Sequence, residues 1–121
     1  MHVSVRDKDF IHHLYKIIRE HIDSVDLNVE VLAKFMNMSR PTLCLKIKGL
    51  SDLSPNELIN ISRLREAAEL LPLKKHSIAQ IATMVGYSVQ SNFSRDFHKH
   101  YGMTPSHFMN THSDKTLPYI R

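Results

Sequence analysis

Apolar residues recur at steps of three and four along most of this chain, which is the spacing that places them on one face of an α-helix. In the first such stretch, residues 8–22, the apolar positions are Phe10, Leu14, Ile17, Ile18 and Ile22. Similar patterns and start signals predict seven helices, over about residues 8–22, 29–36, 39–50, 55–71, 78–85, 88–100 and 104–108. Because no segment shows the alternation of a β-strand, the sequence predicts an all-α fold.

Six of the predicted helices begin beside a side chain that can accept hydrogen bonds from the unpaired backbone N–H groups of a first turn. These candidate caps are Asp7 or Asp9, Ser39, Ser54, Ser77, Ser88 and Thr104. Ser54 is followed by Pro55 and Glu57, a capping-box pattern that marks the start of a long helix. Pro72 is expected to end that helix because proline has no N–H. The buried side of the helix is predicted to hold Leu58, Ile61, Leu64, Ala68 and Leu71.

The pattern of residues 29–48 returns over residues 78–99. Each copy has a short helix with a small alanine, a tight turn and a second helix, which is typical of a helix-turn-helix unit. The matched positions are Leu32-Ala33 with Ile81-Ala82, Asn37-Met38-Ser39 with Gly86-Tyr87-Ser88, and Leu43 and Ile47 with Phe93 and Phe97, the second copy having one extra residue. Two units joined by a long linker helix favour a DNA-binding protein whose second helices enter successive major grooves, about 34 Å apart.

Positive charge is concentrated in the part of the chain that contains this repeat. The 121 residues have a formal charge of +4, but residues 1–30 carry six acids and four bases, whereas residues 31–121 carry six acids and twelve bases. The excess of twelve bases over six acids gives the second stretch a charge of +6. Such a charge suits a polyanionic partner.

Other kinds of function find little support. The single cysteine, Cys44, excludes an internal disulfide, and no apolar run approaches the roughly 20 residues that span a bilayer. A cytoplasmic location without membrane contact is therefore expected. The pairs His12-His13 and His98-x-His100 lack the steps of three or four that place two ligands on one helical face, so neither a metal nor another cofactor is expected. No catalytic residue is predicted, because glycine-rich phosphate loops, usable carboxylate pairs and nucleophile motifs are missing.

Several short runs of residues in the two copies form a recognisable set. Those of the second copy are Ile78-Ala79-Gln80-Ile81-Ala82, Val85-Gly86-Tyr87-Ser88, Phe93-Ser94-Arg95-Asp96-Phe97 and Tyr101-Gly102-Met103-Thr104-Pro105. Those of the first copy and the linker are Leu32-Ala33, Met38-Ser39-Arg40, Leu43, Lys46-Ile47-Lys48, Ser54-Pro55, Arg63-Leu64, Ala67 and Leu70-Leu71. Together these runs closely resemble the AraC/XylS-type DNA-binding domain, over about residues 8–108.

The resemblance implies a domain over residues 8–110, an N-terminal extension over 1–7 and a flexible tail over 111–121. Residues 36–40, 46–50 and 54–57 most resemble the C-terminal output domain of hybrid two-component regulators from Bacteroides-type bacteria. The implied partners are double-stranded DNA, RNA polymerase, and receiver and kinase domains of the same polypeptide, of which a kinase domain would carry the enzymatic activity. The isolated domain is expected to be a monomer or a weak dimer.

In the first unit, the resemblance assigns the base-facing positions to Arg40, Pro41, Cys44 and Leu45, and positions near phosphates to Thr42, Lys46 and Lys48. This face departs from the family pattern, because three of its base-facing side chains have almost no hydrogen-bonding capacity. Apolar contact with thymine methyl groups remains available. The alternatives are that Leu45 belongs to the core, that the lysines are only solvated, and that the first unit does not read bases.

The second unit is richer in polar groups. The resemblance assigns base reading to Gln90, Ser91, Asn92 and Arg95, and phosphate contacts to Ser88, Ser94 and His98. Glutamine and asparagine can pair bidentately with adenine, and arginine with guanine. The alternative is that the polar residues form a solvated face. Phe93 and Phe97 are predicted to belong to the core.

Two further questions stay open at this level. Arg63 and Arg65 on the linker helix are compatible with contacts to the DNA backbone or with pairing to the neighbouring Glu66 and Glu69. The whole chain is compatible with a helical protein-interaction module whose basic face is incidental. The salt dependence of binding distinguishes DNA binding from protein interaction, because binding to phosphates weakens steeply as the salt concentration rises.

Overall fold

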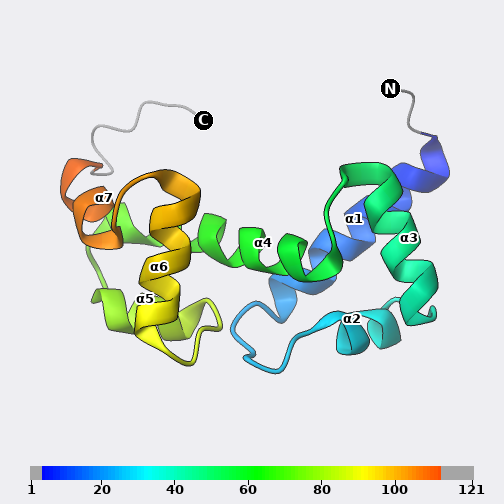
Figure 1. Cartoon of the computed structure of the whole chain (residues 1–121), viewed down its shortest axis with the longest axis horizontal. Coiled ribbons are helices and arrows are strands. Elements are labelled where there is room, and N and C mark those ends of the chain that lie inside the picture. Colours follow the sequence, from blue (N-terminus) through cyan, green and yellow to red (C-terminus); the bar gives the residue numbers. More distant parts are fainter. Residues whose placement is uncertain (1–3, 113–121) are drawn as a thin grey trace. The chain divides into compact units, whose positions relative to one another are not determined.

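The computed structural model describes residues 4–112, and within them the chain is entirely helical, as predicted (Figure 1). The elements are α1 (Val5–Glu20), α2 (Val29–Phe35), α3 (Arg40–Ser51), α4 (Pro55–Leu70), a short 3-10 helix η1 (Leu71–Leu73), α5 (Ile78–Met84), α6 (Gln90–Tyr101) and α7 (Pro105–Thr111). These seven α-helices match the seven predicted ones. The last predicted helix is longer than expected and includes Thr111, while residues 113–121 of the predicted tail lie outside the described residues.

The chain divides into two compact units, residues 1–62 and 63–121, and α4 runs from the first into the second. Each unit has its own hydrophobic core. The first core contains Leu14, Ile17, Ile18, Leu27, Val29, Leu32, Ala33, Met36, Leu43, Ile47, Leu58 and Ile59. The second core contains Leu64, Ala67, Leu71, Ile81, Ala82, Val85, Phe93 and Phe97. One helix-turn-helix unit therefore lies in each half.

The buried side of α4 differs from the predicted one. Leu58, Leu64 and Leu71 are buried as expected, but Ile61 and Ala68 are only half-buried. Ile59 and Ala67 are buried in their place. The physical reason is that α4 and the turn after it supply residues to both cores, so their buried positions do not follow one continuous stripe.

Helix starts follow the predicted caps at four positions. The hydroxyls of Ser39, Ser77 and Thr104 accept hydrogen bonds from backbone N–H groups of α3, α5 and α7. Before α4, the Ser54 N–H donates to Glu57 Oε1 (2.8 Å) and the Glu57 N–H donates to Ser54 Oγ (3.2 Å). The pKa of the Glu57 carboxyl is lowered, first by the hydrogen bond from the Ser54 backbone and then by one from the Ser54 side chain. The predicted capping box is therefore formed.

Two predicted caps are wrong. Helix α1 begins at Val5, because Ser4 Oγ accepts from the Asp7 N–H at 3.1 Å. Asp7 and Asp9 thus lie inside α1, and a residue upstream of the first apolar repeat supplies the cap. Helix α6 begins at Gln90 with Val89 at its cap position and no capping side chain. Ser88 is one residue too early to cap it, because the extra residue of the second copy stands between Ser88 and the helix.

Candidate nucleic-acid interface

The two predicted turns share one backbone geometry. Asn37 after α2 and Gly86 after α5 both have left-handed dihedrals, with φ of 57° and 93°. The residue that follows each one donates its N–H back into the preceding helix, from Met38 to Ala33 O at 3.1 Å and from Tyr87 to Ala82 O at 2.9 Å. Such a bond from the residue after a left-handed position closes a helix C-terminus sharply. The internal repeat seen in the sequence is therefore a repeat of structure.

The second helix of each unit is held by a pair of buried side chains on one face. Leu43 and Ile47 of α3 lie in the first core, and Phe93 and Phe97 of α6 lie in the second. The rings of Phe93 and Phe97 are fully buried, with centroids 5.7 Å apart, so their assignment to the core is confirmed. These anchors determine which face of α3 and of α6 is exposed.

The exposed face of α3 is largely apolar at its centre. Leu45 is 75% exposed, which excludes the alternative that it belongs to the core. Arg40, Pro41, Thr42 and Lys48 are also exposed, whereas Cys44 and Lys46 are half-buried. The structure thus brings the residues predicted for the first unit together on one helix, with little hydrogen-bonding capacity at the middle.

Three of the polar residues predicted on α3 already have partners. Arg40 Nη1 lies 3.1 Å from Glu30 Oε2. Thr42 Oγ1 accepts a hydrogen bond from Ser39 Oγ at 2.9 Å. Lys46 Nζ lies 4.9 Å above the Phe10 ring of α1, a cation–π contact. DNA phosphates would have to compete with these interactions.

Helix α6 presents a polar exposed face. Gln90, Ser91, Asn92, Arg95 and His98 are exposed, Ser94 is half-buried, and Ser88 is exposed in the preceding turn. All of the residues predicted for the second unit therefore lie on α6 or directly before it. The face carries amide, hydroxyl and guanidinium groups, which are the groups that recognise base edges in the major groove.

A hydrogen-bonded group links this face to the turn before it. Arg95 Nε donates to Asp96 Oδ1 at 3.2 Å, and Arg95 Nη1 donates to Asn92 Oδ1 at 3.3 Å. On its other oxygen, Asp96 accepts from the Tyr87 hydroxyl at 3.0 Å. Burial raises the pKa of the Tyr87 phenol, and its hydrogen bond to Asp96 raises it further. Tyr87 and Asp96 were not predicted as site residues, because nothing in the local sequence pairs two residues nine positions apart.

Arg63 of α4 is also placed differently from both sequence expectations. Its side chain is buried in the second unit, and Nη1 donates to the Val85 carbonyl oxygen at 3.0 Å. That carbonyl belongs to the cap residue directly after α5, just before the left-handed Gly86. Arg63 therefore stabilises the turn from inside and is not a surface contact, whereas Arg65 is exposed. The sequence offered one indication that Arg63 is buried. It lies four residues before the buried Ala67, and residues four apart share one face of a helix.

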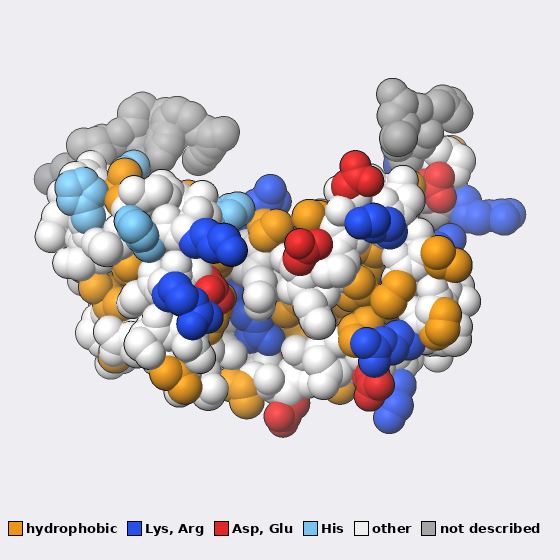
Figure 2. All heavy atoms as spheres, viewed as in Figure 1, with side chains coloured by type: hydrophobic (Ala, Val, Ile, Leu, Met, Phe, Trp, Pro, Cys, Tyr) orange, Lys and Arg blue, Asp and Glu red, His pale blue; other side chains and the backbone are white. Residues whose placement is uncertain are grey.

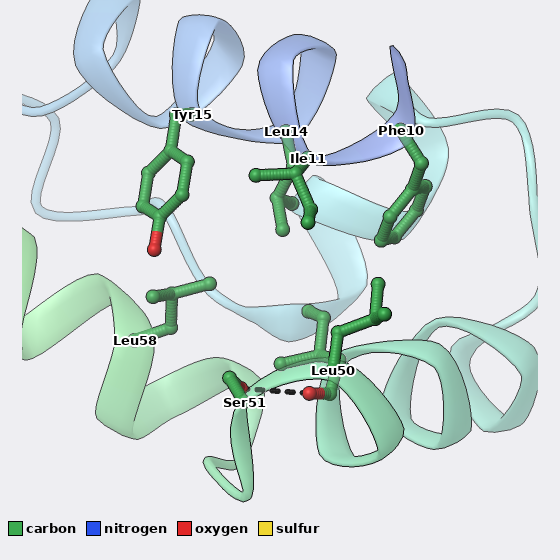
Figure 3. A pocket seen from close by; sticks show the side chains of 8 residues that line it. Phe10, Ile11, Leu14, Tyr15, Leu50, Ser51 and Leu58 are labelled. Carbon is green, nitrogen blue, oxygen red and sulfur yellow. Dashed lines mark hydrogen bonds between the residues drawn. The ribbon is translucent and has the colours of Figure 1, made fainter. Parts of the chain in front are cut away.

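Other surface features offer less chemistry. A cavity of about 70 Å³ in the first unit, between α1, α3 and the start of α4, is lined mainly by apolar residues such as Phe10, Leu14 and Leu58 (Figure 3). The Ser51 hydroxyl on its wall donates to the Ile47 carbonyl oxygen at 2.7 Å.

Residues 4–112 contain no group of three or more metal-ligating side chains. Within the same residues, no helix combines the length and apolarity needed to cross a bilayer. On the face drawn in Figure 2, acidic side chains stand among the lysines and arginines.

Comparison with known proteins identifies the family. A family model described as a helix-turn-helix domain matches residues 32–111, which contain both helix-turn-helix units. The chain belongs to the AraC-type helix-turn-helix family. Members of this family are DNA-binding domains of transcription regulators.

Individual proteins of known name are similar to this chain. Histidine kinase P4 of Formosa agariphila is 33% identical over 113 residues, which are 93% of this chain and 8% of that protein. The C-terminal domain of AraT, a response regulator from Geobacillus stearothermophilus, is 30% identical with a TM-score of 0.80, covering 100% of this chain and 95% of that one. The DNA-binding domain of AdpA, solved in complex with a target DNA, has the same fold. It is 22% identical with a TM-score of 0.73, and the match covers 82% of this chain and 91% of that one.

This AraC-type chain is much shorter than its curated relatives. It spans 8% of the Formosa histidine kinase, and 30% to 40% of three transcriptional regulators. The shared part is the helix-turn-helix domain.

Proposed function

We propose that this AraC-type domain reads DNA bases mainly through the exposed face of α6 and uses α3 as an anchor. The observation that carries the proposal is the contrast between the two faces. Helix α6 exposes Gln90, Asn92 and Arg95, whose side chains can form hydrogen bonds with base edges, whereas α3 exposes Pro41 and Leu45, which cannot. The helix with more donors and acceptors at its exposed face can discriminate among more base pairs.

For α3 we propose a mainly non-specific role. Arg40, Thr42, Lys46 and Lys48 would contact phosphates, and Leu45 and Cys44 would contact thymine methyl groups. In the second unit, Ser88, Ser94 and His98 would contact phosphates beside the base-reading residues Gln90, Ser91, Asn92 and Arg95. Such phosphate contacts position the protein and supply affinity without reading sequence.

The test is a fluorescence-anisotropy titration against genomic fragments taken from upstream of candidate genes, at two salt concentrations. Wild type is compared with Arg95→Ala and with Lys16→Ala, which removes the same charge from the exposed surface of α1. We expect one fragment to bind far more tightly than the rest. Arg95→Ala should weaken that binding by about 10- to 100-fold, the loss of one good base contact, and Lys16→Ala should change it less than threefold.

Two other outcomes have clear meanings. Equal, salt-sensitive binding to every fragment, unchanged by Arg95→Ala, would mean that the domain contacts only phosphates and that α6 does not read bases. No binding at low salt would favour the protein-interaction module instead.

We also propose that the domain is the output part of a larger two-component signalling protein located in the cytoplasm. The relatives named as a histidine kinase and a response regulator support this proposal. Receiver and kinase domains of the same polypeptide would then control a domain that is a monomer or weak dimer by itself, because dimerisation raises the effective affinity of paired sites. RNA polymerase would be the protein partner on DNA.

Phosphorylation of the parent protein should therefore strengthen binding to the selected fragment by at least tenfold, as measured by anisotropy before and after phosphorylation. Sedimentation of the isolated domain should give a monomer at micromolar concentration. Equal DNA affinity of the phosphorylated and unphosphorylated protein would contradict the signalling role.

A further inference from the structure

The carboxylate of Asp96 lies between Tyr87, in the turn of the second unit, and Arg95 on the exposed face of α6. Its Oδ2 accepts from the Tyr87 hydroxyl at 3.0 Å, and its Oδ1 lies 3.2 Å from both Nε and Nη2 of Arg95. The Asp96 side chain is 26% exposed, whereas that of Arg95 is 69% exposed. Asp96 therefore connects an inner, fixed hydroxyl to an outer, accessible guanidinium.

Tyr87, the inner end of this connection, is packed against the second core. The Tyr87 ring packs edge-on against the buried Phe93 ring at a centroid distance of 5.4 Å. The Tyr87 phenol is protonated at physiological pH even at its ordinary pKa of 10.0, which burial raises further, so its hydroxyl can donate to Asp96. Arg63 supports the same turn through its bond to the Val85 carbonyl. The position of Asp96 is thus set by the core of the second unit.

The outer end determines which hydrogen-bonding groups reach DNA. A guanidinium has five N–H donors, and Arg95 directs Nε and Nη2 toward Asp96 and one N–H of Nη1 toward Asn92 Oδ1. N–H groups on both Nη atoms remain. Asn92, whose oxygen already accepts one hydrogen bond from Arg95, has both of its amide N–H groups left to offer. The centre of the face therefore presents donors.

We infer that Asp96 is a positioning residue for DNA recognition, which orients Arg95 and, through it, Asn92, so that α6 selects guanine over adenine at the base pair it meets. Guanine shows two acceptors, N7 and O6, in the major groove, whereas adenine shows one acceptor and one donor. An array of N–H donors satisfies guanine and leaves the adenine N6 amino group without an acceptor. This inference rests on the proposed function of α6.

A structural role and a recognition role for Asp96 predict different results. The Arg95–Asp96 pair is exposed on one side, and exposed ion pairs contribute little to stability. A variant that only destabilised the fold would lower binding to every DNA by the same factor. The ratio of affinities for two DNAs that differ by one base pair cancels that factor and reports recognition alone.

The experiment first finds the base pair at which Arg95→Ala removes discrimination, by testing single substitutions in the selected fragment. At that pair, wild type should prefer guanine over adenine by about tenfold. Tyr87→Phe and Asp96→Asn should each reduce this preference to less than about threefold. The matched control is Tyr101→Phe, which removes the hydroxyl of another half-buried tyrosine in the same core and leaves Asp96 bonded to Tyr87. It should keep the tenfold preference.

A double variant tests whether Asp96 acts through Arg95. Asp96→Asn should cause no further loss of preference when Arg95 is already alanine, because the two residues would belong to one interaction. Retention of the guanine preference in both Tyr87→Phe and Asp96→Asn would overturn the positioning role, as would a preference for adenine at the Arg95 site. If Arg95→Ala itself leaves discrimination intact at every base pair, the proposed reading role of α6 fails instead.

Discussion

At the scale of single residues, two leucines on α3 show how helix geometry separates a core position from an exposed one. Leu43 and Leu45 are two residues apart, but Leu43 is fully buried and Leu45 is 75% exposed. Two steps along an α-helix turn the side chain by about 200°, so the two residues point to opposite faces. One belongs to the first core and the other to the exposed face of α3.

Substituting each leucine by alanine should therefore have different effects. Leu43→Ala should lower the free energy of unfolding by about 2–5 kcal/mol, because it leaves a cavity in the core. Leu45→Ala should change it by less than about 0.5 kcal/mol. Urea denaturation followed by circular dichroism measures both values. A large loss in Leu45→Ala would mean that α3 is packed differently from the structure.

At the scale of helices, the second unit shows how one residue changes the start of a helix. Ser77 caps α5 by accepting from the Gln80 N–H at 3.1 Å, and Gln80 Oε1 accepts in return from the Ser77 N–H at 2.8 Å. Ser88 stands before α6 in the same way along the sequence, but Val89 separates it from the helix. A cap must be the residue directly before the first turn for its side chain to reach the free N–H groups.

The two serines consequently make a matched pair for a stability measurement. Ser77→Ala should cost about 1 kcal/mol, the usual value for loss of an N-terminal cap. Ser88→Ala should cost less than about 0.5 kcal/mol, because no capping hydrogen bond is lost. Thermal unfolding of both variants provides the comparison, and equal destabilisation would contradict the observed start of α6.

At the scale of the whole molecule, the chain has two hydrophobic cores connected by a continuous helix. Leu32 is fully buried in the first core and Ile81 is fully buried in the second, at equivalent positions of the two units. Proteins with separate cores open in parts, each with its own free energy. The two units should therefore respond separately to damage.

Hydrogen exchange of backbone amides tests this independence. Ile81→Ala should accelerate exchange in α5 and α6, corresponding to a loss of about 2–5 kcal/mol in that unit. Exchange in α2 and α3 should change little, and Leu32→Ala should produce the reverse pattern. Equal acceleration in all helices after either substitution would show that the two cores unfold as one.

The sequence by itself determined the helices, the two turns and the core anchors. Apolar spacing is a local property, so it predicted seven helices and identified Phe93 and Phe97 as core residues. Asn37 and Gly86 marked the turns because few other residues tolerate left-handed dihedrals. The faces of α3 and α6 then followed from the side chains opposite those anchors.

Only the tertiary structure decided what the side chains of Arg63, Tyr87 and Asp96 contact. The burial of Arg63 depends on the Val85 carbonyl, which is 22 positions away, and the bond from Tyr87 to Asp96 depends on how the turn packs against α6. The predicted caps at Asp7 or Asp9 and at Ser88 were wrong because helix starts depend on backbone geometry to within one residue. Hydrophobic burial follows periodicity that is visible in one segment, whereas a hydrogen bond requires two particular atoms to meet within about 3 Å. Their meeting is a property of the folded chain.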